Sequence, residues 1–394
     1  ARYARIALDG MAALDNEQDE AYQVLLVNGA EIFFGIGDLE TAAGLAQKAL
    51  DLTRKYHPYN LNRQMTALSW LIAVDEKNTD YGAQLAHHKE YEDLRKNKNG
   101  SYGLIDLESD LSASVIYGNL GDYEKVAELS ERILRIHDTA IAEKNGIAHS
   151  PYELAALSNL CCNMVPDRLD DKEKLKTYAD RLEGCLNARD DIGDKALLPS
   201  LHNLSNAYYH LGDTVRCLKY GDRLLAGLSA DQGEFLPRAE ALQGLHRIEL
   251  GHAEEGRRLM EHGLAVADTM LRGKSSANYL HILRSYVNGA DILGDKSRRN
   301  ALAMEYGRNV RDYVSGSFLN MSSAIRATFW NKYSPFLMND FHGYVAESGD
   351  TAMTRAAYDN LLLGKGLLLD TDRGIREAIA ETGDSKVAAA YESY

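Results

Sequence analysis

The sequence predicts an all-α protein, an α-solenoid of about seven stacked helix pairs with a repeat of about 42 residues and a nonrepeating helical cap at its C-terminal end. Three observations lead to this prediction. Apolar residues recur with the spacing of one helix face, Gly-Asp turns return at similar intervals, and strand signals are nearly absent. Because a short helix hairpin cannot bury its own apolar face, each pair must stack on its neighbours.

The segment 201–228 is the clearest helix pair. Its first half carries Leu201, Leu204 and Tyr208 on one helix face. Gly212 can take the left-handed conformation that ends a helix, and Asp213 can cap the next helix. An apolar stripe marks that second helix, made of Leu218, Leu224 and Leu225.

Comparable turns divide the rest of the chain. They fall at Gly37-Asp38, Thr79-Asp80, Gly121-Asp122, Gly212-Asp213, Gly251-His252 and Gly294-Asp295. Successive turns are about 39 to 43 residues apart, except for a gap of 91 residues between Gly121 and Gly212. Since a gap of that length holds two units, a further turn is expected between residues 166 and 171. The array then covers roughly residues 16–312.

The residues around these turns repeat as well. An aromatic residue, Phe33, Tyr117 or Tyr208, precedes the turn glycine by four positions, and small residues such as Ala42 and Ala46 follow it. This pattern resembles the tetratricopeptide repeat, and the long spacing is similar to that of kinesin-light-chain-like arrays. With this resemblance we expect a right-handed superhelix, in which the first helix of each pair lines a concave groove.

The period fades beyond about residue 314, so we expect a repeat array at 1–313 and a separate C-terminal helical segment at 314–394. In order, that segment contains Arg326-x-x-Phe329-Trp330, Ala357-Tyr358-Asp359, a leucine-rich stretch ending at Leu369, and Arg376. These features resemble the segment that precedes the peptidase domain of CHAT proteins, in which tetratricopeptide-like repeats lead into a caspase-like cysteine protease. The catalytic His and Cys of that family lie after this segment. Because the sequence ends at Tyr394, no residue inherits the dyad, and we expect this chain not to be an enzyme.

The leucine-rich stretch is expected to form a domain-docking platform. Leucine stands on nearly every side of one helix, at Leu361, Leu362, Leu363, Leu367, Leu368 and Leu369. A helix that is apolar all round must be covered on more than one face. In a complete CHAT-like protein the following domain could cover one face, and without it the leucines would be exposed or buried in a dimer. The alternative is that the helical cap encloses all of them.

Polar and aromatic residues on the first helices define a candidate peptide groove, made of Trp70, Asn159, Asn203, Asn206, Arg284 and Asn288. Trp70, Asn159 and Asn203 occupy equivalent positions in three repeats. Asparagine can pair with both the N–H and the C=O of a peptide backbone, and arginine can hold a carboxylate. The alternative is that these are exposed helix residues without a partner.

Composition and motifs argue against other classes of site. The net charge of −14 argues against a nucleic-acid partner and a membrane surface, and no apolar run is long enough for a membrane span. No metal or other cofactor is expected, because the 12 histidines are scattered and the 4 cysteines lack Cys-x-x-Cys spacing. The segment Gly289–Ser297 is a near miss to a phosphate-binding loop, since Asp295 separates its second glycine from the lysine.

Together these inferences favour a protein-interaction or regulatory scaffold, the repeat module of a CHAT-type protease, which binds a peptide or protein segment in its groove. An alternative from another class is a sensor or ligand-binding repeat domain of a signalling kinase or transcription regulator. The residues encoded after Tyr394 would discriminate between them. Cysteines without paired spacing slightly favour the cytoplasm, but the chain begins at Ala1 without a methionine, so we expect that its native N-terminus is missing.

Overall fold

The computed structural model describes residues 2–13, 17–97, 104–143, 148–189, 194–229, 233–270, 276–318, 321 and 323–382. The chain forms two compact units, which are residues 1–119 with 320–322 (unit 1) and residues 120–319 with 323–394 (unit 2). Within the described ranges the regular structure is helical and no strand occurs, which confirms the all-α prediction.

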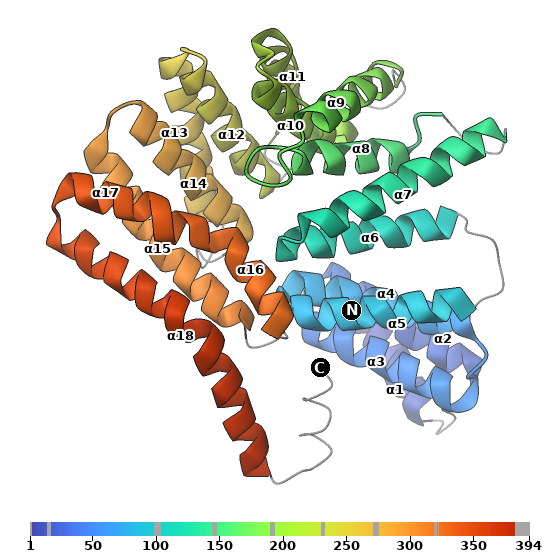
Figure 1. Cartoon of the computed structure of the whole chain (residues 1–394). Helices are drawn as coiled ribbons and strands as arrows, with labels where there is room; N and C mark the ends of the chain where they lie inside the picture. The colour runs from blue at the N-terminus through green and yellow to red at the C-terminus, as the bar shows by residue number, and fades with distance from the viewer. Residues whose placement is uncertain are drawn as a thin grey trace. The chain divides into compact units, whose positions relative to one another are not determined.

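Unit 1 is built from helices that follow one another in antiparallel pairs (Figure 1). They are α1 (Arg2–Ala13), α2 (Glu20–Gly35), α3 (Leu39–Tyr56), α4 (Leu61–Asn78), α5 (Tyr81–Asn97) and α6 (Leu104–Leu120), whose last residue already belongs to unit 2. Helix α2 packs on α3, α4 packs on α5, and α2 also contacts α4. The buried small residues Ala42, Ala46 and Ala49 of α3 let these helices approach closely.

Unit 2 continues the same arrangement. Its paired helices are α7 (Tyr123–Ala142), α8 (Pro151–Asn163), α9 (Lys172–Asn187), α10 (Asp194–Leu211), α11 (Thr214–Gly227), α12 (Phe235–Glu249), α13 (Ala253–Met270), α14 (Ala277–Ile292) and α15 (Lys296–Phe318). Each of α8, α10, α12 and α14 packs on the helix that follows it in the chain. In addition α8 packs on α10, and α12 packs on α14, so first helices of successive pairs lie side by side.

The expected turns end one helix and cap the next. Gly37 and Gly212 have φ of 81° and 79°, a conformation that costs glycine little because it has no β-carbon. The following aspartates accept hydrogen bonds from backbone N–H groups, from Thr41 to Asp38 at 3.2 Å and from Arg216 to Asp213 at 2.9 Å. Positive φ also marks the turns at Thr79, Gly121, Asp170, Gly251 and Gly294. The turn expected between residues 166 and 171 is confirmed, since α8 ends before it and α9 begins after it.

Helices α12 and α13 approach until their backbones touch. A β-carbon added at Gly256 would lie 2.4 Å from the carbonyl oxygen of Gly244 and 2.7 Å from Cγ1 of Ile248. One added at Gly244 would lie 2.7 Å from the carbonyl oxygen of Gly256. Both distances are shorter than carbon–oxygen contacts in packed proteins, so this crossing requires glycine in both helices.

The C-terminal helices of unit 2 pack around aromatic side chains. They are α16 (Ser323–Pro335), the π-helix η2 (Phe336–Asp340), α17 (Phe341–Ser348) and α18 (Thr351–Thr382). Tyr313 of α15 contacts Phe329 and Tyr333 of α16, with ring centroids 5.8 and 5.6 Å apart. Buried Arg326 donates from Nε to the carbonyl oxygen of Phe318 at 3.0 Å. The domain boundary predicted at residue 313/314 falls inside α15, and that division stays a prediction.

Helix α18 buries one side and exposes another. Met353, Ala357 and Asn360 are buried, whereas Leu361 and Leu362 are 39% and 51% exposed. Leu363 is half-buried. The side chains of the other three predicted docking residues, Leu367, Leu368 and Leu369, lie outside the described residues. The docking platform therefore stays a prediction. The exposure of Leu361 and Leu362 is compatible with it.

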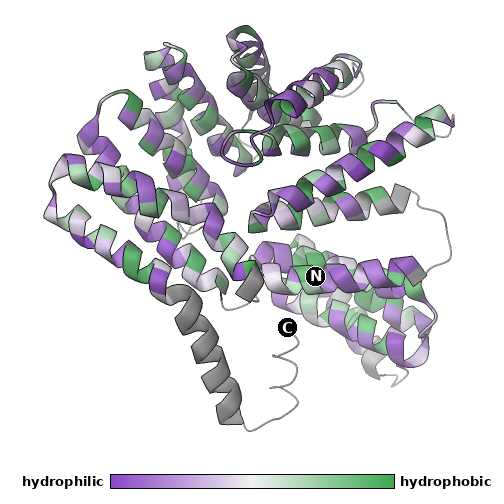
Figure 2. Cartoon of the chain, viewed as in Figure 1, coloured by the Kyte–Doolittle hydropathy of each residue, from purple (hydrophilic) through white to green (hydrophobic). Residues whose placement is uncertain are grey.

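Hydrophobic and hydrophilic residues occur within single helices of both units, as amphipathic helices require (Figure 2). None of the described helices combines the length and the apolarity that a membrane span needs.

Candidate functional site

Unit 2 contains two adjoining cavities of about 390 and 310 Å³. They share four lining residues, Asp167, Arg168, His281 and Arg284. We call the hollow that the two cavities form together the basic groove.

The first helices of three successive pairs line the smaller cavity. Its lining residues from these helices are His202, Asn203, Asn206, Tyr209 and His210 on α10, Arg238, Leu242, Leu245, His246 and Glu249 on α12, and His281, Arg284, Ser285 and Asn288 on α14. Residues three, four and seven positions apart share a helix face, so each helix presents one polar stripe to the groove. The second helices α11 and α13 contribute no residue to this lining.

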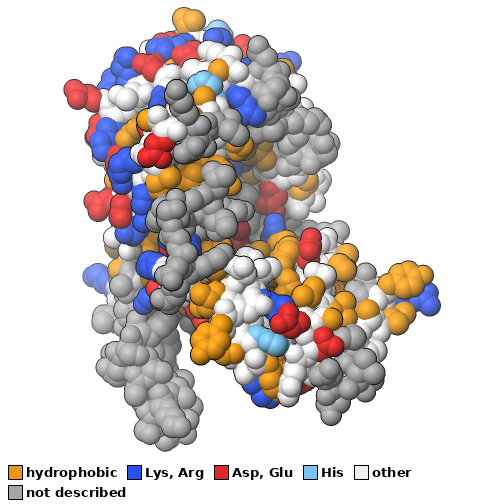
Figure 3. Space-filling model, turned by 90° about the vertical axis from the view of Figure 1, so that its right-hand side faces the viewer, with side chains coloured by type: hydrophobic (Ala, Val, Ile, Leu, Met, Phe, Trp, Pro, Cys, Tyr) orange, Lys and Arg blue, Asp and Glu red, His pale blue; other side chains and the backbone are white. Residues whose placement is uncertain are grey.

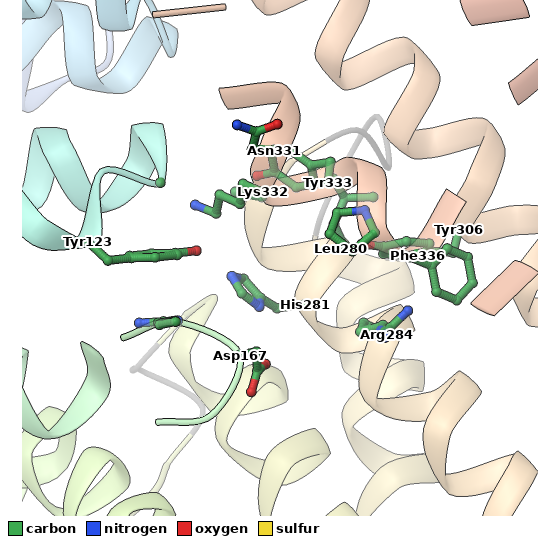
Figure 4. A pocket seen from close by; sticks show the side chains of 14 residues that line it. Tyr123, Asp167, Leu280, His281, Arg284, Tyr306, Asn331, Lys332, Tyr333 and Phe336 are labelled. Carbon is green, nitrogen blue, oxygen red and sulfur yellow. The ribbon is translucent and has the colours of Figure 1, made fainter. Parts of the chain in front are cut away.

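The larger cavity brings in residues from distant parts of unit 2. Tyr123 comes from the start of α7, Asp167 from the turn between α8 and α9, and Lys332 from α16. In Figure 4 Tyr123, His281 and Lys332 point into the same space. The C-terminal helices thus complete a groove whose remainder is built by helix pairs.

Basic side chains outnumber acidic ones in this lining. The basic residues are Arg168, Arg238, Arg284 and Lys332 with His202, His210, His246 and His281, against the acids Asp167 and Glu249. The whole chain has a net charge of −14. On the face shown in Figure 3, basic and acidic side chains are interspersed, without a broad field of one sign. The groove is therefore a local basic region on an acidic protein, which favours an anionic ligand.

The three arginines of the groove differ in how many contacts they already make with other residues of the chain. Arg284 donates to Asp340 at 2.5 Å and lies 4.5 Å from the ring centroid of Phe336. Arg168 donates to the carbonyl oxygen of Cys162 at 2.8 Å, and its guanidinium lies over the ring of Tyr123. Arg238 has no hydrogen bond or ion pair with any residue that the structure describes. A half-buried guanidinium without a carboxylate is the group in this groove most ready to receive an anion.

Burial, with repulsion from neighbouring basic groups, keeps the histidines of the groove neutral. Burial, with repulsion from Arg238, lowers the pKa of His202 to about 3. Burial also lowers the pKa of His246 well below its usual value. The pKa of His281 is also lowered, by desolvation between the walls of the groove and then by repulsion from Arg238, and the outer side of its ring stays exposed. These histidines are hydrogen-bonding and stacking groups at neutral pH and add no charge.

Lys332 is the side chain of the groove that titrates near neutrality. Burial, with repulsion from Arg168 and Arg238, lowers its pKa to about 7. An anion bound beside it would favour its charged form, since opposite charges raise the pKa of an amine. Binding of an anion would therefore increase the fraction of Lys332 that is protonated, and with it the positive charge of the groove.

Four of the predicted groove residues lie together. Asn203, Asn206, Arg284 and Asn288 all line the smaller cavity. Asn159 lines neither cavity. Trp70 belongs to unit 1, where it packs against Phe34 with a centroid distance of 5.5 Å.

The asparagines are partly used within the fold. Nδ2 of Asn203 donates to the hydroxyl of Ser158 at 2.8 Å, and Oδ1 of Asn206 lies 3.2 Å from Nε2 of His246. The ring of His246 in turn stacks on Tyr209, at a centroid distance of 4.3 Å. Each amide keeps its second polar atom without a hydrogen bond to the described residues, so both a structural role and a ligand role fit this geometry.

Arg168, Arg238 and Lys332 were not among the groove residues predicted from sequence. Arg238 could have been predicted from the repeat pattern, because it lies on the groove-facing side of α12 as His202 does on α10. Arg168 lies in a turn and Lys332 in a nonrepeating helix, so no periodicity connects them to the groove.

Comparisons with known proteins add little to this picture. No family model matches the chain, and no curated protein matches it. Among solved structures the chain is similar to a circular tandem repeat protein with a novel repeat topology and enhanced subunit contact surfaces, at 14% identity over 97% of this chain and 96% of that chain. The TM-score is 0.28, a value too low to carry an argument about fold or function.

Proposed function

We propose that this chain is a protein-interaction module, a right-handed solenoid of tetratricopeptide-like helix pairs with a period of about 42 residues, that binds an extended acidic segment of a partner protein in the basic groove. The observation that carries the proposal is Arg238, a half-buried cation in the groove without a partner among the described residues. A carboxylate that reached this guanidinium would form a charge-assisted hydrogen bond, for which mutational series give about 1.5–3 kcal/mol.

A peptide suits the groove better than a bare anion does. Asn203, Asn206 and Asn288 line the same cavity as Arg238, on the helices α10 and α14 to either side of α12 in the chain. Amide side chains can pair with a peptide backbone while a basic group holds an acidic side chain. The net charge of −14 disfavours a polynucleotide, whose many phosphates would be repelled by the rest of the surface.

The resemblance to CHAT proteins extends the proposal to regulation. In this proposal a peptidase domain follows the module and docks on the exposed Leu361 and Leu362 of α18. Binding of a partner in the groove would then change the activity of that domain. We expect residues 1–394 themselves to have no peptidase activity. Cys161, Cys185 and Cys217 are buried, and a nucleophile must reach its substrate. Cys162 lines the smaller cavity, so it is the cysteine whose substitution by alanine tests this expectation.

The test is fluorescence anisotropy with a dye-labelled oligoglutamate peptide, with an oligolysine peptide and a single-stranded oligonucleotide as competitors. We expect the glutamate peptide to bind and Arg238→Ala to weaken it about tenfold to a hundredfold. The matched control is Arg258→Ala, which removes an exposed arginine of α13 outside the groove and should leave affinity unchanged.

The proposal fails if the glutamate peptide does not bind, or if Arg238→Ala and Arg258→Ala weaken it equally. Displacement by the oligonucleotide in preference to acidic peptides would point to a nucleic-acid ligand instead. Measuring affinity between pH 8 and pH 6 adds an internal check. Because Lys332 gains its proton as the pH falls through about 7, binding should tighten in this window, and Lys332→Gln should remove that dependence.

The sensor reading has one observation in its favour. Cavities of about 390 and 310 Å³ are within the range of small-molecule sites. A sensor domain would bind a small dicarboxylate or phosphate ester more tightly than the peptide, and competition in the same anisotropy assay would reveal this.

A further inference from the structure

A cluster of metal-ligand types lies in unit 2 away from the basic groove. It joins His149, just before α8, Glu153 in the first turn of α8, and Cys185 in the last turn of α9. Nδ1 of His149 is 3.3 Å from Sγ of Cys185 and 3.8 Å from Oε2 of Glu153. The three ligand atoms all lie within 4.8 Å of one another.

These distances suit a tetrahedral ion. Zinc binds sulfur at about 2.3 Å and nitrogen or oxygen at about 2.0–2.2 Å, so neighbouring ligand atoms around it are about 3.3–3.6 Å apart. The His149–Cys185 separation of 3.3 Å falls in this range, and the His149–Glu153 separation of 3.8 Å is slightly longer, so the three ligand atoms would draw together around an ion. A thiolate with imidazole and carboxylate is also a donor set that favours zinc over magnesium or calcium.

Glu153 also belongs to a second group of metal-ligand types, with His137 and Asp138. Nε2 of His137, from α7, is 3.6 Å from Oε2 of Glu153. Its other nitrogen, Nδ1, faces Oδ1 of Asp138 at 3.4 Å. His137 thus lies beside a ligand of the cluster, where it can hold the carboxylate of Glu153 in position.

The local backbone holds His149 in place. Its φ is 57°, an uncommon value for a residue with a β-carbon. Its N–H donates to Oε2 of Glu153 at 2.9 Å, and its carbonyl oxygen accepts from Arg189 at 2.7 Å. Positive φ outside glycine persists where the surroundings fix it, and such positions cluster at functional sites.

The charges around the cluster balance once a dication is present. Arg181 donates to Oε1 of Glu153 at 2.9 Å and to Oδ2 of Asp138 at 3.0 Å, which leaves Oε2 of Glu153 to the histidines. One dication would neutralise the thiolate and the carboxylate, while Asp138 neutralises Arg181. Cys185 is 1% exposed, so its sulfur cannot reach an external substrate as a nucleophile.

We propose that His149, Glu153 and Cys185 bind a divalent metal ion of the zinc class, with a solvent molecule in the fourth position, and that the ion ties the start of α8 to the end of α9. The site is independent of the basic groove and of the function proposed for it. No metal was expected from the sequence, because its histidines are scattered and its cysteines lack Cys-x-x-Cys spacing. His149 and Glu153 meet Cys185, 32 residues beyond Glu153, only in the fold.

Cobalt titration of the full chain, stripped of metal with a chelator, tests the proposal. We expect about one cobalt ion per chain, a near-ultraviolet thiolate-to-cobalt charge-transfer band, and a melting temperature that rises with metal. Zinc should displace the cobalt and abolish the band. Cys185→Ala should remove the band, and His149→Gln should weaken binding by about tenfold or more.

The matched control is Cys217→Ala. Cys217 is also buried and its Sγ lies 3.8 Å from Nδ1 of His246, but it belongs to neither group of ligands close enough to share an ion. The band should persist in this variant. Absence of the band in the unmodified chain overturns the proposal, as does its retention in Cys185→Ala. If Cys185→Ala does not fold, His149→Gln decides, because this residue is partly exposed and unchanged affinity there contradicts the site.

Discussion

At the scale of single residues, burial of His202 couples stability to acid. Its pKa is about 3 in the folded chain and about 6.5 when unfolded. Between these values the unfolded state binds more protons, so the stabilising contribution is complete above pH 6.5 and is lost as the pH falls toward 3. Each such group contributes a slope of up to about 1.4 kcal/mol per pH unit.

His202→Gln should therefore flatten the pH dependence of the free energy of unfolding. Urea unfolding at pH 7 and pH 4.5 measures it, and the variant should lose less stability than the unmodified chain. His252→Gln, at an exposed position outside the groove, is the control and should keep the original dependence. Parallel losses in the His202 variant and the unmodified chain would show that His202 is not the responsible group.

Gly256 is a second residue whose environment leads to a sharp expectation. A methyl group there meets the backbone of α12 at 2.4 Å, so Gly256→Ala must push the helices apart. Overpacking of this kind typically costs about 1–3 kcal/mol. Gly184→Ala on α9 is the matched control, because nothing lies within 4 Å of its added β-carbon. It should stabilise by about 0.5–1 kcal/mol, and chemical denaturation of both variants should give opposite signs.

At the scale of helices, the aspartates after the turn residues act as caps. Asp122 accepts a hydrogen bond from the backbone N–H of Lys125 at 3.1 Å at the start of α7. Asp122→Ala should lower the free energy of unfolding by about 0.5–2 kcal/mol. Asp122→Asn keeps an acceptor and should restore most of it. Equal losses in both variants would mean that charge, and not the cap, is what matters.

These caps also explain why helix boundaries were predictable from sequence. A glycine and an aspartate act on their own neighbours, so Gly212 and Asp213 reveal a turn without knowledge of the fold. The turn at Asp170 lacks glycine, and only the doubled gap between Gly121 and Gly212 indicated it. Local chemistry and spacing together were sufficient for the paired helices.

At the scale of the whole molecule, the site was only partly predictable. Asn203 and Asn288 follow the helix period, and their common cavity could be anticipated. Lys332 could not, because its place depends on how α16 packs on the earlier pairs. The partners of an asparagine are equally hidden, since Asn203 reaches Ser158 across 45 residues of sequence. Sequence periodicity indicates which side of a helix faces inward, and tertiary packing decides what it meets there.

The glycine contact between α12 and α13 has a mechanical consequence. Helices separated by long side chains can slide and tilt relative to each other as those side chains change rotamer. Two helices whose backbones are in direct contact cannot move relative to each other in this way. Helix α12 can thus move only if α13 moves with it, which makes it the stiff wall of the groove. We therefore expect a ligand that needs a wider opening to displace α10 or α14 rather than α12.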